Sequence, residues 1–186
     1  MQRRTLLKGA GLAMAGAALP GLALASDKAL AKADTNPLDN ELDKYPRCVI
    51  CNMDRRQFHF SRHLLHYADG IAEGTCSINC TSECMVRERR RGFTAIYGAD
   101  FGTPGEPKPM VEVSAATYLI GASLRPVMSP VSKYVFARQA DAEAVMAESG
   151  GRLASFEEAV AASLEDYARM VNQRYREDRA EAASKG

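Results

Sequence analysis

Hydrophobic and polar positions alternate along the chain after Pro46 in a pattern that predicts short strands. The segments "FHFSRHLLHY" and "IAEGTCS" flank "ADG", which predicts a β-hairpin that turns at Asp69 and Gly70. Ser77 then stands where a helix cap is expected, before a helix over residues 78–91 that Gly92 ends. "FTAIYGADF" follows as a strand, so residues 46–101 are predicted to form a ββαβ unit.

The same order of elements recurs after residues 102–109, which are a linker by their Gly and Pro content. "MVEVSAATYLIGAS" predicts one strand region or two short strands, and "SKYVFA" predicts the next strand. "QADAEAVMAESGG" predicts a helix with a glycine stop, and "RLASF" a short strand. Residues 110–155 are therefore predicted to form a second ββαβ unit.

The last segment, residues 156–186, carries apolar side chains at helical spacing, namely Phe156, Val160, Leu164, Tyr167 and Val171. This spacing predicts a long amphipathic helix that packs on the two units and ends in a frayed tail. The predicted fold class is α+β, with two ββαβ units in tandem and a long C-terminal amphipathic helix.

The first 25 residues have the features of an export signal. Arg3 and Arg4 precede the mildly apolar run "GAGLAMAGAALPGLALA", in which Ala23 and Ala25 suit a signal peptidase. The run is too short and too rich in Ala and Gly for a membrane span. We therefore expect a twin-arginine signal that the Tat translocase reads, cleavage after Ala25, a periplasmic protein without a stable membrane span, and a linker over residues 26–45.

The remaining 161 residues suffice for one domain or two small ones. Their composition limits the classes of function that the protein can have. Cleavage removes three basic residues and leaves 21 basic against 23 acidic ones, so nothing indicates a nucleic-acid partner. Export places the five cysteines where disulfides can persist. Five is an odd number, so at least one thiol is left for another chemistry.

Every cysteine and histidine of the chain lies between Cys48 and Cys84. The motif "CVICNM" holds Cys48 and Cys51, a spacing shared by redox dithiols, zinc half-sites and simple disulfides. Met53, two residues later, favours monovalent copper, because soft thioether and thiolate sulfurs match a soft cation; core packing is the alternative for this side chain. Neighbouring arginines are expected to lower the pKa of the thiols: Arg47, Arg55 and Arg56.

The histidines separate by face if residues 58–67 form one strand. His59 and His63 then point to the more polar side and are candidate ligands, with His63 alternatively orienting a ligand. His66 shares the opposite face with apolar side chains and is expected to be mostly buried: Phe58, Phe60 and Leu64.

The remaining cysteines, Cys76, Cys80 and Cys84, follow an i, i+4, i+8 pattern at the predicted helix. Cys76 and Cys80 lie at the helix N-terminus, which favours thiolates. They form a bridge or supply ligands to the same metal. Cys84 is interpreted as a small buried side chain.

Five segments together resemble the NosL family over residues 46–160: "CVICNM", "HYADG", "GTCSINC", "YLIGAS…PVMSP" and "VFARQADAEAVMAESGGRLASFEEA". The resemblance implies an exported copper-binding accessory protein that delivers Cu(I) to nitrous oxide reductase. It also implies a pair of ββαβ units, a topology linked to organomercurial lyase. Cys51 and Met53 match the family's copper ligands, and Met128 matches a recurrent methionine with a ligand or gate role.

Three features depart from the family pattern. Asn52 replaces the usual glycine, and no cysteine stands at the cleavage site, where many members carry a lipid anchor. The additional cysteines and the histidines indicate a richer site than one copper ion needs. These departures affect the identity of the client enzyme more than the identity of the metal.

Three classes of function follow. The leading hypothesis is a metal carrier without turnover, a metallochaperone that holds Cu(I) on Cys51 and Met53 with Cys48 or a histidine as third ligand. The second is a closed zinc or multi-cysteine structural site made of Cys48, Cys51, Cys76 and Cys80. The third is an enzyme, acting by thiol–disulfide exchange or as an organomercurial-lyase-like protein with Asp54 as the acid.

Overall fold

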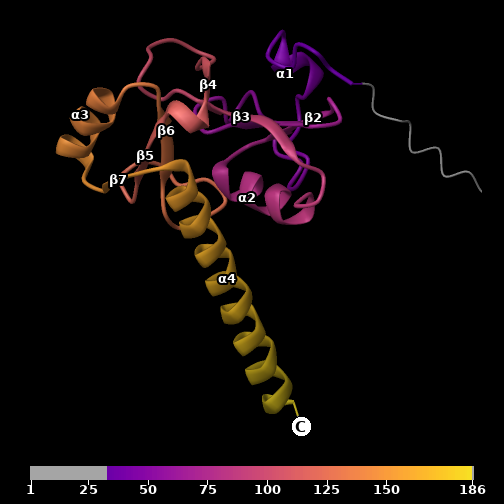
Figure 1. Ribbon diagram of the computed structural model, residues 1–186. Helices are drawn as coiled ribbons and strands as arrows, with labels where there is room; N and C mark the ends of the chain where they lie inside the picture. Colours follow the sequence, from indigo (N-terminus) through magenta and orange to yellow (C-terminus); the bar gives the residue numbers. More distant parts are fainter. Residues whose placement is uncertain (1–32, 186) are drawn as a thin grey trace, which may run out of the picture. The chain divides into compact units, whose positions relative to one another are not determined.

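The computed structural model describes residues 33–185 and contains two successive ββαβ units (Figure 1). The first unit consists of β1 (His63–Tyr67), β2 (Ala72–Thr75), α2 (Ile78–Arg87) and β3 (Phe93–Ala99). The second consists of β5 (Thr117–Ile120), β6 (Lys133–Phe136), α3 (Gln139–Ser149) and β7 (Arg152–Ala154). The other elements are α1 (Glu41–Lys44), β4 (Met110–Glu112), η1 (Val113–Ala115) and α4 (Phe156–Ser184). The export signal predicted for residues 1–25 lies outside the described residues.

Both units use the same antiparallel strand order, with the first strand in the centre. The orders are β2-β1-β3 and β6-β5-β7. The predicted hairpin is confirmed: His63 pairs with Thr75 and His66 with Ala72, and Gly70 takes φ 79°, a value that a glycine adopts without steric cost. The predicted α+β fold of two ββαβ units and a long C-terminal helix is therefore confirmed.

β4 joins the first sheet, although the sequence pattern assigned residues 110–112 to the second unit. Gly98 of β3 pairs with Val111, and Ala99 with Met110. The free edge of β3 offers unpaired backbone groups, and the chain returning from the linker satisfies them.

Two predicted boundaries were too wide. β1 begins at His63 rather than Phe58, because the backbone N–H groups of Ser61 and Arg62 both donate to the Phe58 carbonyl and close a turn. α2 ends at Arg87 rather than residue 91, and its last turn is closed by the Glu88 N–H on the Cys84 carbonyl. His59 consequently lies outside the strand on which its position had been inferred.

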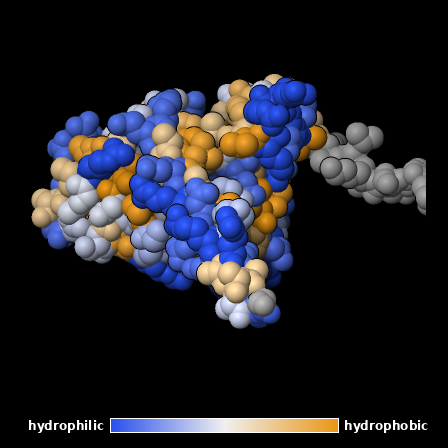
Figure 2. Space-filling view, turned by 90° about the horizontal axis from the view of Figure 1, so that it is seen from below, coloured by the Kyte–Doolittle hydropathy of each residue, from blue (hydrophilic) through white to orange (hydrophobic). Residues whose placement is uncertain are grey.

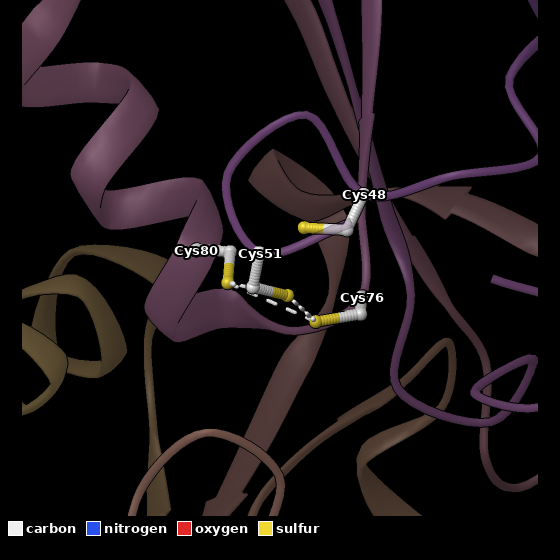
Figure 3. Close-up of side chains that lie close together, drawn as sticks. All are labelled: Cys48, Cys51, Cys76 and Cys80. Carbon is white, nitrogen blue, oxygen red and sulfur yellow. Dashed lines mark hydrogen bonds between the residues drawn. The ribbon is translucent and has the colours of Figure 1, made fainter. Parts of the chain in front are cut away.

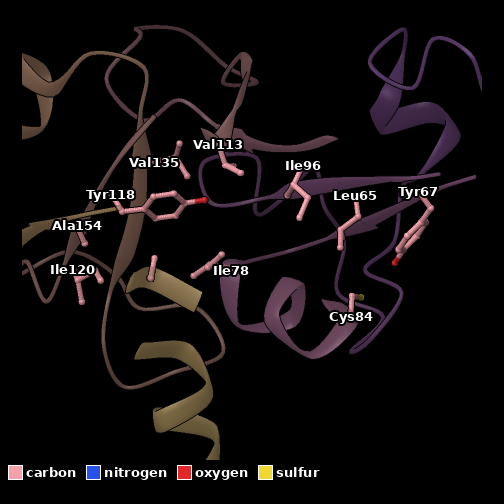
Figure 4. Close-up of a cluster of buried hydrophobic side chains, with 11 residues drawn as sticks. Leu65, Tyr67, Ile78, Cys84, Ile96, Val113, Tyr118, Ile120, Val135 and Ala154 are labelled. Atoms are coloured by element: carbon pink, nitrogen blue, oxygen red, sulfur yellow. The ribbon is translucent and has the colours of Figure 1, made fainter. Parts of the chain in front are cut away.

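The two units share one hydrophobic core (Figure 4). Leu65 and Ile96 of the first sheet lie in the same buried cluster as Tyr118 and Val135 of the second. Ile78 of α2 and Ala159 of α4 belong to this cluster as well. At the junction of the sheets, the Phe101 N–H donates to the Val135 carbonyl over 2.8 Å.

Residues 33–45, predicted as part of a linker, contact the first unit. The Asp34 N–H donates to the Gly70 carbonyl over 2.8 Å. Glu41 of α1 is buried and forms ion pairs of 2.8 Å with Arg55 and 2.7 Å with Arg62. A buried carboxylate needs such partners to offset the loss of its hydration.

α4 packs on the units only over its first three turns. Ala159 and Ser163 are buried, whereas Leu164, Tyr167 and Val171, predicted to lie on the packing face, are exposed. Every residue from 167 to 185 is exposed. Figure 2, a view from below α4, shows hydrophilic residues over much of this face with apolar ones between them. In the part of the chain that the structure describes, no helix combines the length and the hydropathy that crossing a bilayer would require.

Candidate metal site

Four cysteines from two separate segments meet beside the N-terminus of α2 (Figure 3). Cys48 and Cys51 lie in the loop before β1, Cys76 directly follows β2, and Cys80 lies in the first turn of α2. Their sulfur atoms all lie within 4.8 Å of one another. The grouping of these thiols, predicted as one possible site, is present.

The sulfur–sulfur distances among Cys51, Cys76 and Cys80 fit a single ion. Cys51 Sγ lies 3.4 Å from Cys76 Sγ and 3.8 Å from Cys80 Sγ, and the Cys76–Cys80 distance is 3.7 Å. A tetrahedron with metal–sulfur bonds of ~2.3 Å has sulfur–sulfur edges of ~3.8 Å. All five cysteines of the chain are free thiols, so the bridge considered between Cys76 and Cys80 is not formed in this structure.

Backbone hydrogen bonds shape the loop that carries the first two thiols. The Cys48 N–H donates to the Met53 carbonyl and the Asn52 N–H to the Cys48 carbonyl, both over 2.9 Å. Asn52 takes φ 61°, the left-handed region that favours glycine and, among other residues, asparagine. Asn52 therefore suits this position, at which the resemblance implies a glycine.

Arg55 ties this loop to the strands. Its side chain is fully buried and donates to three backbone carbonyls, those of Tyr45, His63 and Thr75. A Cβ at Gly74 would lie 2.6 Å from the guanidinium, so any side chain there would have to displace Arg55 from its hydrogen bonds. Because Thr75 immediately precedes Cys76, Arg55 holds the two cysteine segments together.

The site is apolar and mostly shielded. Cys48, Cys76 and Cys80 are buried in one cluster with Phe58 and Val127. Cys51 and Met53 are half-buried and pack against this cluster, so the site is least shielded on their side. Met53, predicted as a soft ligand, is thus adjacent to the thiols, and packing and ligation are both compatible with its place.

Contacts among the thiols shift their pKa values in opposite directions. Hydrogen bonds from Cys76 and Cys80 hold the pKa of Cys48 far below its ordinary value. The pKa values of Cys76 and Cys80 are raised, chiefly by the same contact with Cys48. Arginines were expected to lower the thiol pKa, but Arg55 pairs with Glu41 and Arg56 with Asp43, and the neighbouring thiols are the main cause instead.

The histidines predicted as ligands lie apart from the sulfurs. His63 is fully buried, with Nδ1 3.0 Å from the Ser61 carbonyl and Nε2 2.9 Å from the Tyr118 hydroxyl. His59 Nε2 lies 3.5 Å from a Glu106 carboxylate oxygen. The geometry gives no support to ligand roles for His59 and His63. His59 lies in the turn before β1, and the ring of His63 is held by Ser61 and Tyr118. His66, expected to be mostly buried, is half-buried.

The structure also shows the surroundings of Cys84, Met128 and Asp54, which the sequence analysis singled out. Cys84 is fully buried in the main core, as interpreted from the sequence, and burial raises its pKa to about 12. Met128 is 42% exposed at φ 57°, next to Val127 of the sulfur cluster. Asp54, the acid of the enzymatic hypothesis, accepts a hydrogen bond from the Arg56 N–H.

Sequence reasoning missed Asn79, whose side chain donates to the Met128 carbonyl over 3.1 Å. It also missed Val127 and Phe58 as walls of the sulfur cluster. Asn79 stands one residue before Cys80 in the sequence, but no local pattern links it to a residue 49 positions later.

Fold and site together define a small α+β protein with a cluster of thiols suited to a soft metal ion. The NosL family model matches residues 39–164, more than half of the chain, and the protein therefore belongs to the NosL family. No curated protein sequence matches this chain.

Two solved structures are similar. The copper chaperone NosL from Shewanella denitrificans is 21% identical, with a TM-score of 0.51 over 60% of this chain and 87% of that one. The apo-NosL protein from Achromobacter cycloclastes is 16% identical, with a TM-score of 0.36 over 51% of this chain and 82% of that one. At 21% identity, the similarity to the Shewanella denitrificans structure shows a shared fold.

Proposed function

We propose that this protein is a Cu(I) carrier, exported to the periplasm by the twin-arginine pathway, that passes its ion to a copper enzyme. Nitrous oxide reductase is the client that the family resemblance favours. The observation that carries the proposal is the convergence of four thiols, without a carboxylate or imidazole among them, beside the thioether-bearing residue Met53. Soft sulfur ligands select monovalent copper.

Transfer of Cu(I) to a client enzyme requires that the bound ion can leave the site. Cys51 and Met53 are half-buried, whereas Cys48, Cys76 and Cys80 are buried. A thiol or thioether of a partner can therefore approach the ion from the side of Cys51. Ligand exchange at the accessible sulfurs then moves the ion without any turnover chemistry, which makes the protein a carrier rather than an enzyme.

The test is the Cu(I) affinity of the reduced, anaerobic protein lacking residues 1–25, measured by competition with a chelator. Cys51→Ser is expected to weaken binding by about 100-fold and Met53→Ala by about tenfold, since even groups that merely orient ligands contribute about 10–100-fold. Cys84→Ala and Met170→Ala serve as matched controls, because Cys84 lies in the main core and Met170 is exposed on α4. Unchanged affinity in both site variants would refute the carrier.

A second candidate is a closed structural zinc site made by the four cysteines. The sulfur–sulfur distances of 3.4–3.8 Å among Cys51, Cys76 and Cys80 favour it, because they are close to the edges of a tetrahedral tetrathiolate site. Elemental analysis of protein purified without added metal separates the two candidates. Zinc that survives washing with a chelator, together with a loss of folding when it is stripped, would establish the structural site.

A further inference from the structure

A short segment between β5 and β6, residues 125–129, covers one side of the sulfur cluster; we name it the strap. Val127 is buried in the same cluster as Cys48, Cys76 and Cys80. The Arg125 guanidinium lies 5.3 Å from the ring centroid of Phe58, which also lines the cluster. The strap therefore packs against the sulfur cluster and covers part of it.

The conformation of the strap has to be held by other parts of the protein. Met128 takes φ 57°, a left-handed conformation that costs a residue other than glycine on the order of 1–2 kcal/mol. Its side chain is 42% exposed, so little packing offsets that cost. Pro126 within the strap and Pro130 directly after it fix φ at their own positions, which restricts the conformations open to the strap.

Asn79 provides the first anchor. Its side-chain amide donates to the Met128 carbonyl over 3.1 Å, and its residue directly precedes Cys80 in the first turn of α2. The same helix end therefore positions both a thiol of the site and the segment that covers it.

Ser129 provides the second anchor. Its hydroxyl donates to the Asp166 carboxylate over 2.6 Å and accepts from the Val131 N–H over 3.0 Å. Lys133 Nζ lies 2.6 Å from the same carboxylate, 3.1 Å from the Ser129 hydroxyl and 3.4 Å from the Asn79 side-chain oxygen. The Lys133 and Asp166 side chains are 1% and 6% exposed, so both anchors end in a buried charged network.

We propose that Asn79 and Ser129 are positioning residues that hold the strap closed over the thiols and thereby set the rate of metal entry and exit. Neither residue contacts the ion. Each acts through the strap, Asn79 from α2 and Ser129 through Asp166 of α4. The inference rests on the proposed function where it concerns metal exchange, but the closing of the strap can be tested on the metal-free protein.

The first test is the alkylation of each cysteine by iodoacetamide in the reduced, metal-free protein without residues 1–25, followed by mass spectrometry. Asn79→Ala and Ser129→Ala are expected to accelerate labelling of the four site cysteines about fivefold, the factor that corresponds to the ~1 kcal/mol of a lost hydrogen bond. Ser114→Ala is the matched control, because Ser114 is exposed and bonds only to Glu112 in the described structure.

Cys84 is an internal control in the same experiment. It lies in the main core rather than beside the strap, so local opening leaves its labelling unchanged. Unchanged rates at the four site cysteines would overturn the proposal. An equal acceleration at Cys84 would overturn it as well, because it would indicate a general loosening of the fold.

The second test is the rate at which the Cu(I)-loaded protein gives its ion to a chelator. Both variants are expected to release copper about fivefold faster with an equilibrium affinity changed less than about twofold, since entry and exit accelerate together. A fall in affinity without faster release would contradict the role of the strap. If the wild-type protein retains no copper, the carrier function fails, and alkylation alone then decides on the strap.

Discussion

Four thiols whose sulfur atoms lie within 4.8 Å of one another cannot all ionise in the absence of a cation, because each new thiolate would face the charge already present. In this site the pKa of Cys48 is lowered by its neighbours, while the pKa values of Cys76 and Cys80 are raised. A bound cation removes this conflict. Metal binding is therefore expected to release protons from Cys76 and Cys80.

The buried side chain of His63 is kept in its neutral form. A carbonyl oxygen can only accept, so Nδ1 carries the proton toward Ser61 and Nε2 accepts from the Tyr118 hydroxyl. Burial lowers the pKa of His63 to about 3. Below pH ~6.5 His63 binds a proton in the unfolded chain but not in the folded chain. The free energy of unfolding therefore decreases as the pH falls from ~6.5 toward ~3.

This linkage can be measured by comparing the wild type with His63→Gln. Between pH 6.5 and 5 the wild type should lose about 1.5 kcal/mol more of its free energy of unfolding than the variant. Denaturant unfolding at the two pH values gives the difference. The window lies above the pH at which carboxylates with lowered pKa values, such as Asp34, begin to contribute. Equal pH dependence in both proteins would contradict a neutral, buried His63.

Among the elements, α4 combines two helical segments with different sources of stability. Its start carries a capping box, in which the Ser155 hydroxyl accepts from the Glu158 N–H and the Glu158 carboxylate accepts from the Ser155 N–H. Its exposed half has ion pairs at i, i+4 spacing, such as Arg174 with Asp178, that support a helix by only a few tenths of a kcal/mol each.

Shortening α4 should therefore have little effect on the fold. A chain that ends after Met170 is expected to keep its free energy of unfolding within ~0.5 kcal/mol, because all residues from 171 to 185 are exposed. A chain that ends after Ser155 is the control, and it should unfold at much lower denaturant because it loses buried Ala159 and the partner of Lys133. A large destabilisation by the first truncation would show that the exposed half of α4 has a partner within the molecule or in a second copy.

At the scale of the whole molecule, Arg55 joins several separate parts of the chain. It contacts Glu41 of α1 and the carbonyls of Tyr45, His63 and Thr75, which lie in the loop, β1 and β2. Without Arg55, these buried acceptors would lose their donor and Glu41 would keep only Arg62.

Arg55→Met is accordingly expected to lower the free energy of unfolding by about 3–5 kcal/mol, the range for breaking a buried ion pair from one side. Arg56→Met should cause little change, because the ion pair of Arg56 with Asp43 is exposed. Denaturant unfolding of the metal-free proteins measures both. Similar effects of the two substitutions would contradict the structural role given to Arg55.

Local pattern by itself determined the sequence of elements and the neighbourhood of the cysteines. Turn residues such as Gly70 and Gly92, strand alternation and helical spacing act over a few residues, and they predicted both ββαβ units. The thiols were predictable as a group because only 32 positions separate Cys48 from Cys80.

Tertiary structure alone decided the contacts between distant segments. It placed His63 on Tyr118 instead of the thiols, β4 on the edge of the first sheet, and the strap on Asn79 and Asp166. It also left the second half of α4 unpacked, although the apolar spacing continues through Val171. Periodicity reports which face of an element is apolar, whereas the partner of that face depends on how the whole chain closes around its shared core.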